Sequence, residues 1–204
     1  GEARDRFLIY LEKRLAEAEK WPNELDLIAS ERYGDIEVLI GSAPAAANWF
    51  GVWAGLSRES GNEFAADYFQ LKRALAYLEL GERRLALEPF DAMSVACKPG
   101  PDTDDVSFQS MLAELSWDGI DEAPRRYLIG FLCLVHGLFY MSGGFYNPAL
   151  DCFAQALAYA KSVPSAFHRR LAAKIALAEA SALLEMGDLE QTAEILAQTT
   201  HQHD

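Results

Sequence analysis

The chain has little of what several large classes of protein depend on. Only three of its 204 residues are cysteines. All three lie in apolar stretches, as free buried cysteines in a reducing compartment do, so we expect no disulfide framework. No apolar run reaches the roughly 18 residues of a membrane span, and the N-terminal segment lacks the apolar core of a signal peptide. The sequence therefore predicts a cytoplasmic protein with no membrane partner.

Positive charge and catalytic motifs are also scarce. The 18 Lys and Arg residues are outnumbered by 31 Asp and Glu, which gives a formal net charge of −13. Nucleic-acid binding depends on neutralising phosphates with Lys and Arg, so we expect no nucleic-acid partner for this domain. No Gly-rich phosphate loop follows a strand, and no nucleophile stands at a recognisable spacing from a base.

The histidines do not change this expectation. His136 is expected to pack between helices, and the pair His201 and His203 lacks a third metal ligand. The sequence therefore predicts no enzyme activity, no metal and no cofactor.

What the sequence does contain is helical periodicity. Half of its residues are apolar, and Ala and Leu dominate over β-branched residues, which favours helices over strands. Apolar residues recur three and four positions apart between Gly and Pro breaks. The spacing predicts helices over residues 2–20, 24–32, 41–59, 63–80, 83–98, 107–115, 121–141, 149–163, 165–186 and 189–199. The expected fold class is all-α, as one extended array of helices.

Two segments leave the local structure open. Residues 33–35 (Tyr-Gly-Asp) are expected to turn the chain before a short apolar element over 36–40. That element is expected to be helical, although its β-branched residues leave a strand open. Pro89 lies inside the segment 83–98, where it either kinks the helix or ends it.

Three glycine breaks carry the same pattern of small and bulky residues. The three copies are Ala74, Tyr77, Gly81, Ala86 and Phe90; Gly137, Tyr140, Gly144, Ala149 and Phe153; and, more loosely, Ala180, Leu183, Gly187, Thr192 and Leu196. The small residues would let two helices approach, and the bulky residues would fill the layer between them. The glycine would end the first helix in a left-handed cap. The pattern therefore predicts repeated helical hairpins.

The clearest copy resembles the tetratricopeptide repeat, whose signature is W-x2-L-G-x2-Y, then A-x3-F, then P. Here the chain reads Cys133-x2-His136-Gly137-x2-Tyr140, then Ala149-x3-Phe153, then Ala156 and Pro164. Cys133 replaces the Trp, His136 replaces the Leu, and the proline comes a few residues late. The glycine breaks are 63 and 43 residues apart, whereas the standard repeat has about 34 residues.

The resemblance implies antiparallel hairpins stacked as a right-handed superhelix, in an irregular variant with long helices. Such domains are attached to bacterial signalling and transcription regulators. The repeats are expected over residues 67–204, with a Pro-, Gly- and Asp-rich linker and an inserted helix at 98–120. Residues 1–66 are expected to be N-terminal helices that pack against or cap the array, or form a degenerate repeat. The chain starts without Met, so we expect a piece of a larger protein.

The resemblance also implies a concave face lined by the first helix of each hairpin. In the first two copies this face is apolar, and the predicted partner-binding groove consists of Tyr68, Leu71, Leu75, Phe131, Leu134, Leu138 and Met141. The matching positions of the last copy include Lys174, Leu177, Ser181 and Leu184. A groove of Leu and Met suits an amphipathic helix or an extended peptide. The alternative is that the N-terminal helix or a second subunit already covers this face.

Basic residues occupy equivalent places in the first turns of two long predicted helices. They are Arg125, Arg126, Arg169 and Arg170, the last two after His168. Positive charge there opposes the helix dipole, so this basic rim is a candidate contact for an acidic partner segment. The alternative is salt bridging to nearby acids, or plain solvated charge.

The sequence thus predicts a non-enzymatic protein–protein interaction module, a scaffold or adaptor that binds a peptide or helix of a partner protein. The alternative is a regulatory, sensor or self-association domain, such as a homodimer, of a larger bacterial signalling or transcription regulator.

Overall fold

The computed structural model describes residues 32–38, 41–93, 120–163 and 165–201. Over these ranges the chain forms eight helices and no strand, which confirms the all-α class. The helices predicted over 2–20 and 107–115, most of that over 24–32, and the linker lie outside the described residues.

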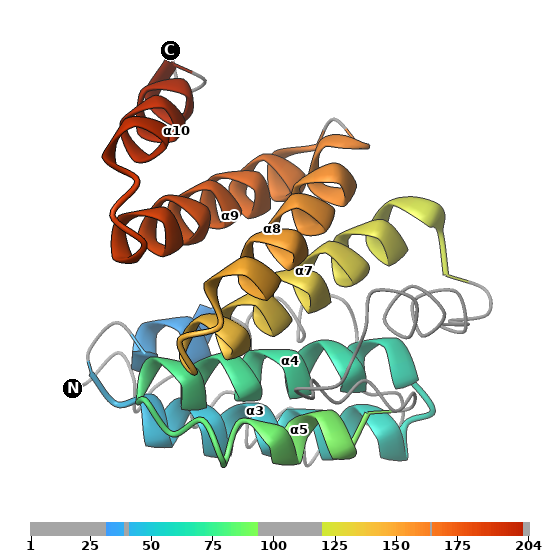
Figure 1. Ribbon diagram of the computed structural model, residues 1–204. Helices are drawn as coiled ribbons and strands as arrows, with labels where there is room; N and C mark the ends of the chain where they lie inside the picture. Colours follow the sequence, from blue (N-terminus) through green and yellow to red (C-terminus); the bar gives the residue numbers. More distant parts are fainter. Residues whose placement is uncertain (1–31, 39–40, 94–119, 164, 202–204) are drawn as a thin grey trace.

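The helices follow one another along the chain with short connections wherever the connection is described (Figure 1). In order they are residues 32–38, α3 (Ala43–Glu59), α4 (Glu63–Glu79), α5 (Leu87–Asp91), α7 (Glu122–Met141), α8 (Tyr146–Lys161), α9 (Ala166–Glu185) and α10 (Leu189–His201).

Two local predictions were wrong. Residues 33–35 do not turn the chain, because they lie inside the helix over residues 32–38. The long helix predicted over 83–98 is also not formed, since residues 83–86 make turns and α5 spans only Leu87–Asp91. Pro89 lies in the first turn of α5, where its missing N–H needs no partner.

The glycine breaks end their helices in the same way. Gly81, Gly144 and Gly187 have φ of +73°, +78° and +82°, a left-handed conformation that favours glycine. In each case the amide of the next residue donates to the carbonyl four residues before the glycine. One such bond joins the Phe145 amide to the Tyr140 carbonyl at 3.0 Å. This is the Schellman cap, and it confirms the left-handed caps predicted at these glycines.

The structure also shows a fourth copy of the pattern, which the sequence analysis missed. Gly41 ends the helix over residues 32–38 with the same cap, at φ +79°. Gly34, Ala46 and Phe50 stand at the same distances from this cap as Gly137, Ala149 and Phe153 stand from theirs. Ala46 and Phe50 are buried. The pattern therefore begins before residue 67, in the segment expected to form packing or capping helices or a degenerate repeat.

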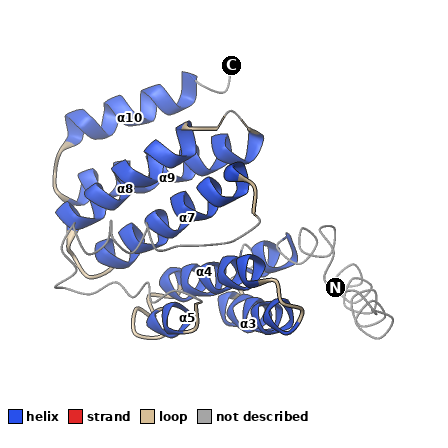
Figure 2. Ribbon diagram, turned by 90° about the vertical axis from the view of Figure 1, so that its right-hand side faces the viewer, coloured by secondary structure: helices blue, strands red, loops and turns tan. Residues whose placement is uncertain are grey.

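The helices pack in a regular order (Figures 1 and 2). Helices that follow one another in the chain pack in four pairs: α3 with α4, α7 with α8, α8 with α9, and α9 with α10. Helix α5 also packs against α4. The first helices of successive copies also touch, since α4 contacts α7 and α7 contacts α9. The described helices are therefore stacked as packed pairs.

Helix α7 lies at the centre of the larger core cluster, which joins it to α4, α5, α8 and α9. Most of its residues between Leu128 and Tyr140 are buried. Arg83, in the turn after α4, donates to the Phe139 carbonyl at 3.3 Å and lies 4.2 Å from the Phe139 ring centroid. A second cluster, centred on Phe50 and Trp53, joins α3 to α4.

Candidate binding groove

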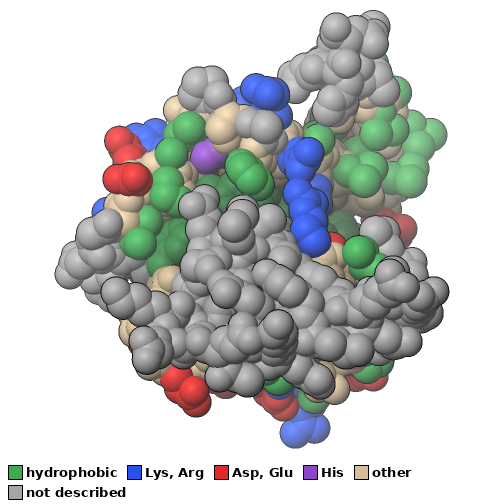
Figure 3. Space-filling model, turned by 180° about the vertical axis from the view of Figure 1, so that it is seen from behind, with side chains coloured by type: hydrophobic (Ala, Val, Ile, Leu, Met, Phe, Trp, Pro, Cys, Tyr) green, Lys and Arg blue, Asp and Glu red, His purple; other side chains and the backbone are tan. Residues whose placement is uncertain are grey.

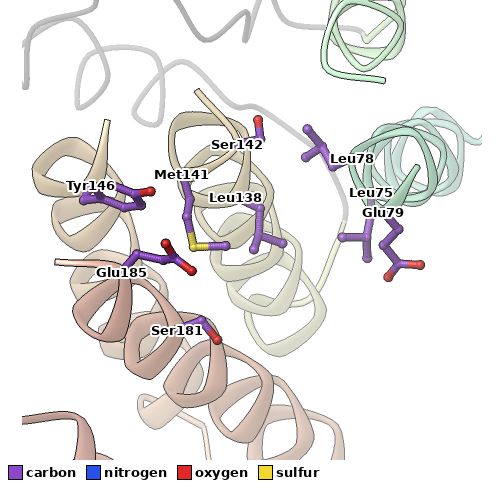
Figure 4. A pocket seen from close by; sticks show the side chains of 9 residues that line it. All are labelled: Leu75, Leu78, Glu79, Leu138, Met141, Ser142, Tyr146, Ser181 and Glu185. Atoms are coloured by element: carbon purple, nitrogen blue, oxygen red, sulfur yellow. The ribbon is translucent and has the colours of Figure 1, made fainter. Parts of the chain in front are cut away.

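A groove of about 420 Å³ opens where the C-terminal parts of α4, α7 and α9 come together (Figure 4). Its lining is Leu75, Leu78 and Glu79 from α4; Leu138 and Met141 from α7 with Ser142 at its end; Tyr146 from α8; and Ser181 and Glu185 from α9. Apart from Tyr146, these residues occupy equivalent positions of the repeated pattern. The groove is therefore built by the repeat itself, with each copy contributing the same few positions.

Three of the seven predicted groove residues line this groove. Leu75, Leu138 and Met141 are half-buried and face it. Figure 4 shows Leu75 of α4 directed towards Leu138 of α7, with Met141 reaching towards α9. Ser181 is one of the matching positions named for the last copy, whereas Leu78, Glu79, Ser142, Tyr146 and Glu185 were not among the predicted groove residues.

The structure places the other predicted groove residues inside the protein. Leu71, Phe131 and Leu134 are at most 2 % exposed and belong to the core cluster around α7. Tyr68 is half-buried, with its ring centroid 5.7 Å from that of Phe131. The N-terminal halves of α4 and α7 therefore pack directly on each other, so these four side chains are not available as the floor of an open groove.

A buried lysine lies beside this packing. The Lys72 side chain is only 3 % exposed, and its Nζ lies 2.6 Å from a carboxylate oxygen of Asp35. The same ammonium lies 5.8–5.9 Å from the ring centroids of Phe50, Tyr68 and Phe131. Attraction between a cation and aromatic faces adds to the ion pair. Lys72 of α4 thus contacts residues of the helix over residues 32–38, of α3 and of α7. In the sequence, its burial was indicated only by the position of one Lys among apolar residues at helical spacing.

Two carboxylates lie beside the apolar floor. Glu79 and Glu185 are the last residues of α4 and α9. Within the described part of the chain, neither carboxylate has an ion-pair partner within 4 Å. Burial raises the pKa of Glu79, and the charges of Lys174 and Lys72 oppose that shift. The groove therefore joins an apolar floor to two carboxylates that have no ion-pair partner among the described residues.

The predicted basic rim lies at the other end of the same helices. Arg125 is in the first turn of α7, 16 residues before Met141, which corresponds to about 24 Å along the helix. Arg126 is paired with Glu122 one turn earlier. Arg169 and Arg170 are exposed in the first turns of α9, equally far from its groove-lining end. The four arginines do not line the groove.

The remaining candidate residues take part in packing. His136 is buried, with its ring 5.0 Å from that of Phe90, so its predicted place between helices is confirmed. His168 is buried beside Tyr127 and shares a 2.7 Å hydrogen bond with Ser165, the N-cap of α9. Burial lowers the pKa of His168. Cys133 and Cys152 are buried free cysteines, and burial raises the pKa of Cys133.

No protein-family model, curated protein or solved structure matches the chain. None of the described helices is long and apolar enough to cross a membrane. In the described residues, no group of three or more His, Cys, Asp or Glu side chains is placed to hold a metal ion.

Proposed function

We propose that the protein is a non-enzymatic interaction module of the tetratricopeptide-like class, which binds a peptide or helix of a partner protein in the groove of α4, α7 and α9. The observation that carries this proposal is that the groove is lined by residues from three helices of the repeated pattern. Three helices contribute equivalent positions, and the apolar ones, Leu75, Leu138 and Met141, are neither in the core nor fully exposed. Apolar grooves between helices are common sites for amphipathic segments.

The packing order supports the class. In a stack of hairpins, each hairpin packs only on its neighbours, so a first helix contacts its own second helix and helices of the adjoining hairpins. Helix α7 contacts α8, α4 and α9, and α9 contacts α10, α8 and α7. A right-handed superhelix follows from this class, and its inner face would carry the groove. The bacterial cytoplasm predicted from the sequence is part of the same proposal.

The test is a pair of variants compared for partner binding. Leu138→Gln removes apolar surface from the groove floor, whereas Val52→Gln removes similar surface from an exposed site on α3. Bait protein with Leu138→Gln should lose partners that the wild-type protein and the Val52→Gln variant retain from the same lysate. Both variants should keep wild-type helicity by circular dichroism. Equal retention of all partners by the three baits would contradict the groove as the binding site.

Self-association is a second candidate function, and exposed apolar residues at the α9–α10 end favour it. Leu177, Leu184 and Leu189 are 61 %, 53 % and 66 % exposed. Figure 3 shows hydrophobic side chains gathered on this end of the molecule. In the earlier copies, Leu71 and Leu134 occupy the position of Leu177 and are buried. Sedimentation velocity tests this function: a dimer that Leu177→Ser converts to monomer would support it, and a monomeric wild type would exclude it.

A further inference from the structure

The electrostatic character of the groove points to the chemistry of its occupant. Glu79 is the last residue of α4 and lies on one side of the groove, and Glu185 is the last residue of α9 and lies on the other side. The apolar residues of α7 lie between them (Figure 4). A carboxylate in the last turn of its own helix is destabilised by the negative end of the helix dipole. Neither carboxylate offsets this destabilisation through an ion pair with a described residue.

The apolar surface continues past the groove. A second hollow of about 290 Å³ lies on the other side of Tyr146 and is lined by Phe145, Pro148 and Met186, among others. Phe145 and Met186 are 47 % and 46 % exposed. Since Glu185 lines the groove and Met186 lines the second hollow, the C-terminal end of α9 borders both.

We propose that the groove binds a cationic amphipathic helix of a partner protein, with its apolar face on Leu75, Leu138 and Met141 and its Lys or Arg side chains at Glu79 and Glu185. This inference rests on the proposed function and adds the charge of the partner. It replaces the acidic partner expected from the sequence, because the four arginines behind that expectation lie at the opposite end of α7 and α9.

Three features of the charges favour a cation. The chain carries a net charge of −13, which steers basic segments towards it and repels acidic ones. The Glu79 carboxylate is partly desolvated. A bound ammonium or guanidinium would therefore stabilise this carboxylate more strongly than the same cation would stabilise a carboxylate that is fully hydrated. Lys174 of α9 is the described cation with the largest effect on Glu79. It lies outside the groove lining, which leaves the groove side of Glu79 open to a ligand.

The experiment uses two synthetic helical peptides of about 15 residues, long enough to form a helix when bound. Both carry leucines at helical spacing, and the remaining positions are lysine in one peptide and glutamate in the other. Binding to the full chain is measured by fluorescence anisotropy at physiological salt. The variants are the double charge reversal Glu79→Lys with Glu185→Lys, the floor variant Leu138→Gln, and the control Glu59→Lys. Glu59 is also an exposed last residue of a helix, on α3 away from the groove.

The proposal predicts that the wild type prefers the lysine peptide to the glutamate peptide by about tenfold or more, from two exposed ion pairs and the avoided repulsion. The double reversal should invert that preference, and Glu59→Lys should leave it unchanged. Leu138→Gln should weaken binding of whichever peptide is preferred.

Other results would overturn the proposal in distinguishable ways. If the wild type prefers the glutamate peptide and Leu138→Gln still weakens binding, the groove functions but its partner is acidic. If Glu59→Lys weakens lysine-peptide binding as much as the double reversal does, the peptide senses only net charge and the cationic site is excluded. If neither peptide binds, both the cationic partner and the groove function fail.

Discussion

Gly137 of α7 lies directly against the ring of Phe153 of α8, so closely that a Cβ at Gly137 would overlap that ring. The same relationship recurs between Gly34 and Phe50, where a Cβ would also overlap the ring. Both pairs are 16 residues apart in the sequence. The small residue and the aromatic ring thus fix how closely the two helices of a hairpin approach.

This contact predicts that Gly137→Ala destabilises the protein although it improves helix propensity. Alanine gains about 1 kcal/mol over glycine in a helix, but overpacking a buried site costs about 1–3 kcal/mol. Phe153 is fully buried and has little room to move. We expect a net loss of about 1 kcal/mol in urea denaturation, with recovery when Phe153→Leu is added.

A matched control exists in α3. A Cβ at Gly55 would meet no atom within 4 Å, so Gly55→Ala should stabilise the protein by up to about 1 kcal/mol. Destabilisation by both alanine variants would mean that the close approach at Gly137 is not the cause.

The ion pair of Lys72 and Asp35 makes a second prediction. Removing one partner of a buried ion pair takes away its attraction for the other charge, which costs about 3–5 kcal/mol in a fully buried site. Because the Asp35 side chain is 32 % exposed, we expect Asp35→Ala to cost about 2–3 kcal/mol. The double variant Lys72→Met with Asp35→Asn should recover most of this loss, since Met packs well among aromatic rings. Thermal denaturation of the three proteins tests the prediction, and equal losses in single and double variants would contradict it.

Two leucines one helical turn apart on α7 should respond differently to substitution. Leu134 is 2 % exposed and belongs to the core, so Leu134→Asp buries a carboxylate and should abolish cooperative unfolding. Leu138 is half-buried at the groove, and Leu138→Gln should cost no more than about 1–2 kcal/mol. Circular dichroism during thermal denaturation distinguishes them. A folded Leu134→Asp variant would show that this part of α7 is open to solvent after all.

The sequence predicted the helices and their caps well because these depend on local properties. The left-handed cap at Gly144 and the spacing of apolar residues can both be recognised within one or two turns, whereas α8 begins at Tyr146, three residues before the start predicted at residue 149. The copy at Gly34 and Gly41 was missed because glycine was interpreted as a turn residue. Its actual role, close approach to Phe50, depends on a helix that begins nine residues later.

Three of the predicted groove residues line the groove of α4, α7 and α9, and the other four pack where α4 and α7 meet. Periodicity shows which side of α7 is apolar, but it does not show where along that side α4 packs. The half of α7 that contains Phe131 and Leu134 packs in the core, beside the buried ion pair of Lys72 and Asp35. The end of α7 with Leu138 and Met141 lines the open groove. The flanking acids Glu79 and Glu185 could not be recognised because they come from helices far apart in the chain.

The raised pKa of Glu79 gives the last prediction, on pH dependence. Burial is the main cause of the shift, with Lys174 and Lys72 opposing it and Asp35 adding to it. A carboxyl group with a higher pKa in the folded state favours folding when protonated, so its ionisation lowers stability as the pH rises. Glu79→Gln should therefore stabilise the protein at pH 7, by about 0.5 kcal/mol or less because solvent still reaches the side chain and screens its charge. The gain should shrink as the pH falls and be lost below the ordinary glutamate pKa of 4.5. Urea denaturation between pH 4 and pH 7 measures it, with Glu59→Gln as the control for removing one negative charge. A gain that persists unchanged at pH 4, or that Glu59→Gln reproduces in full, would show that the groove does not desolvate Glu79.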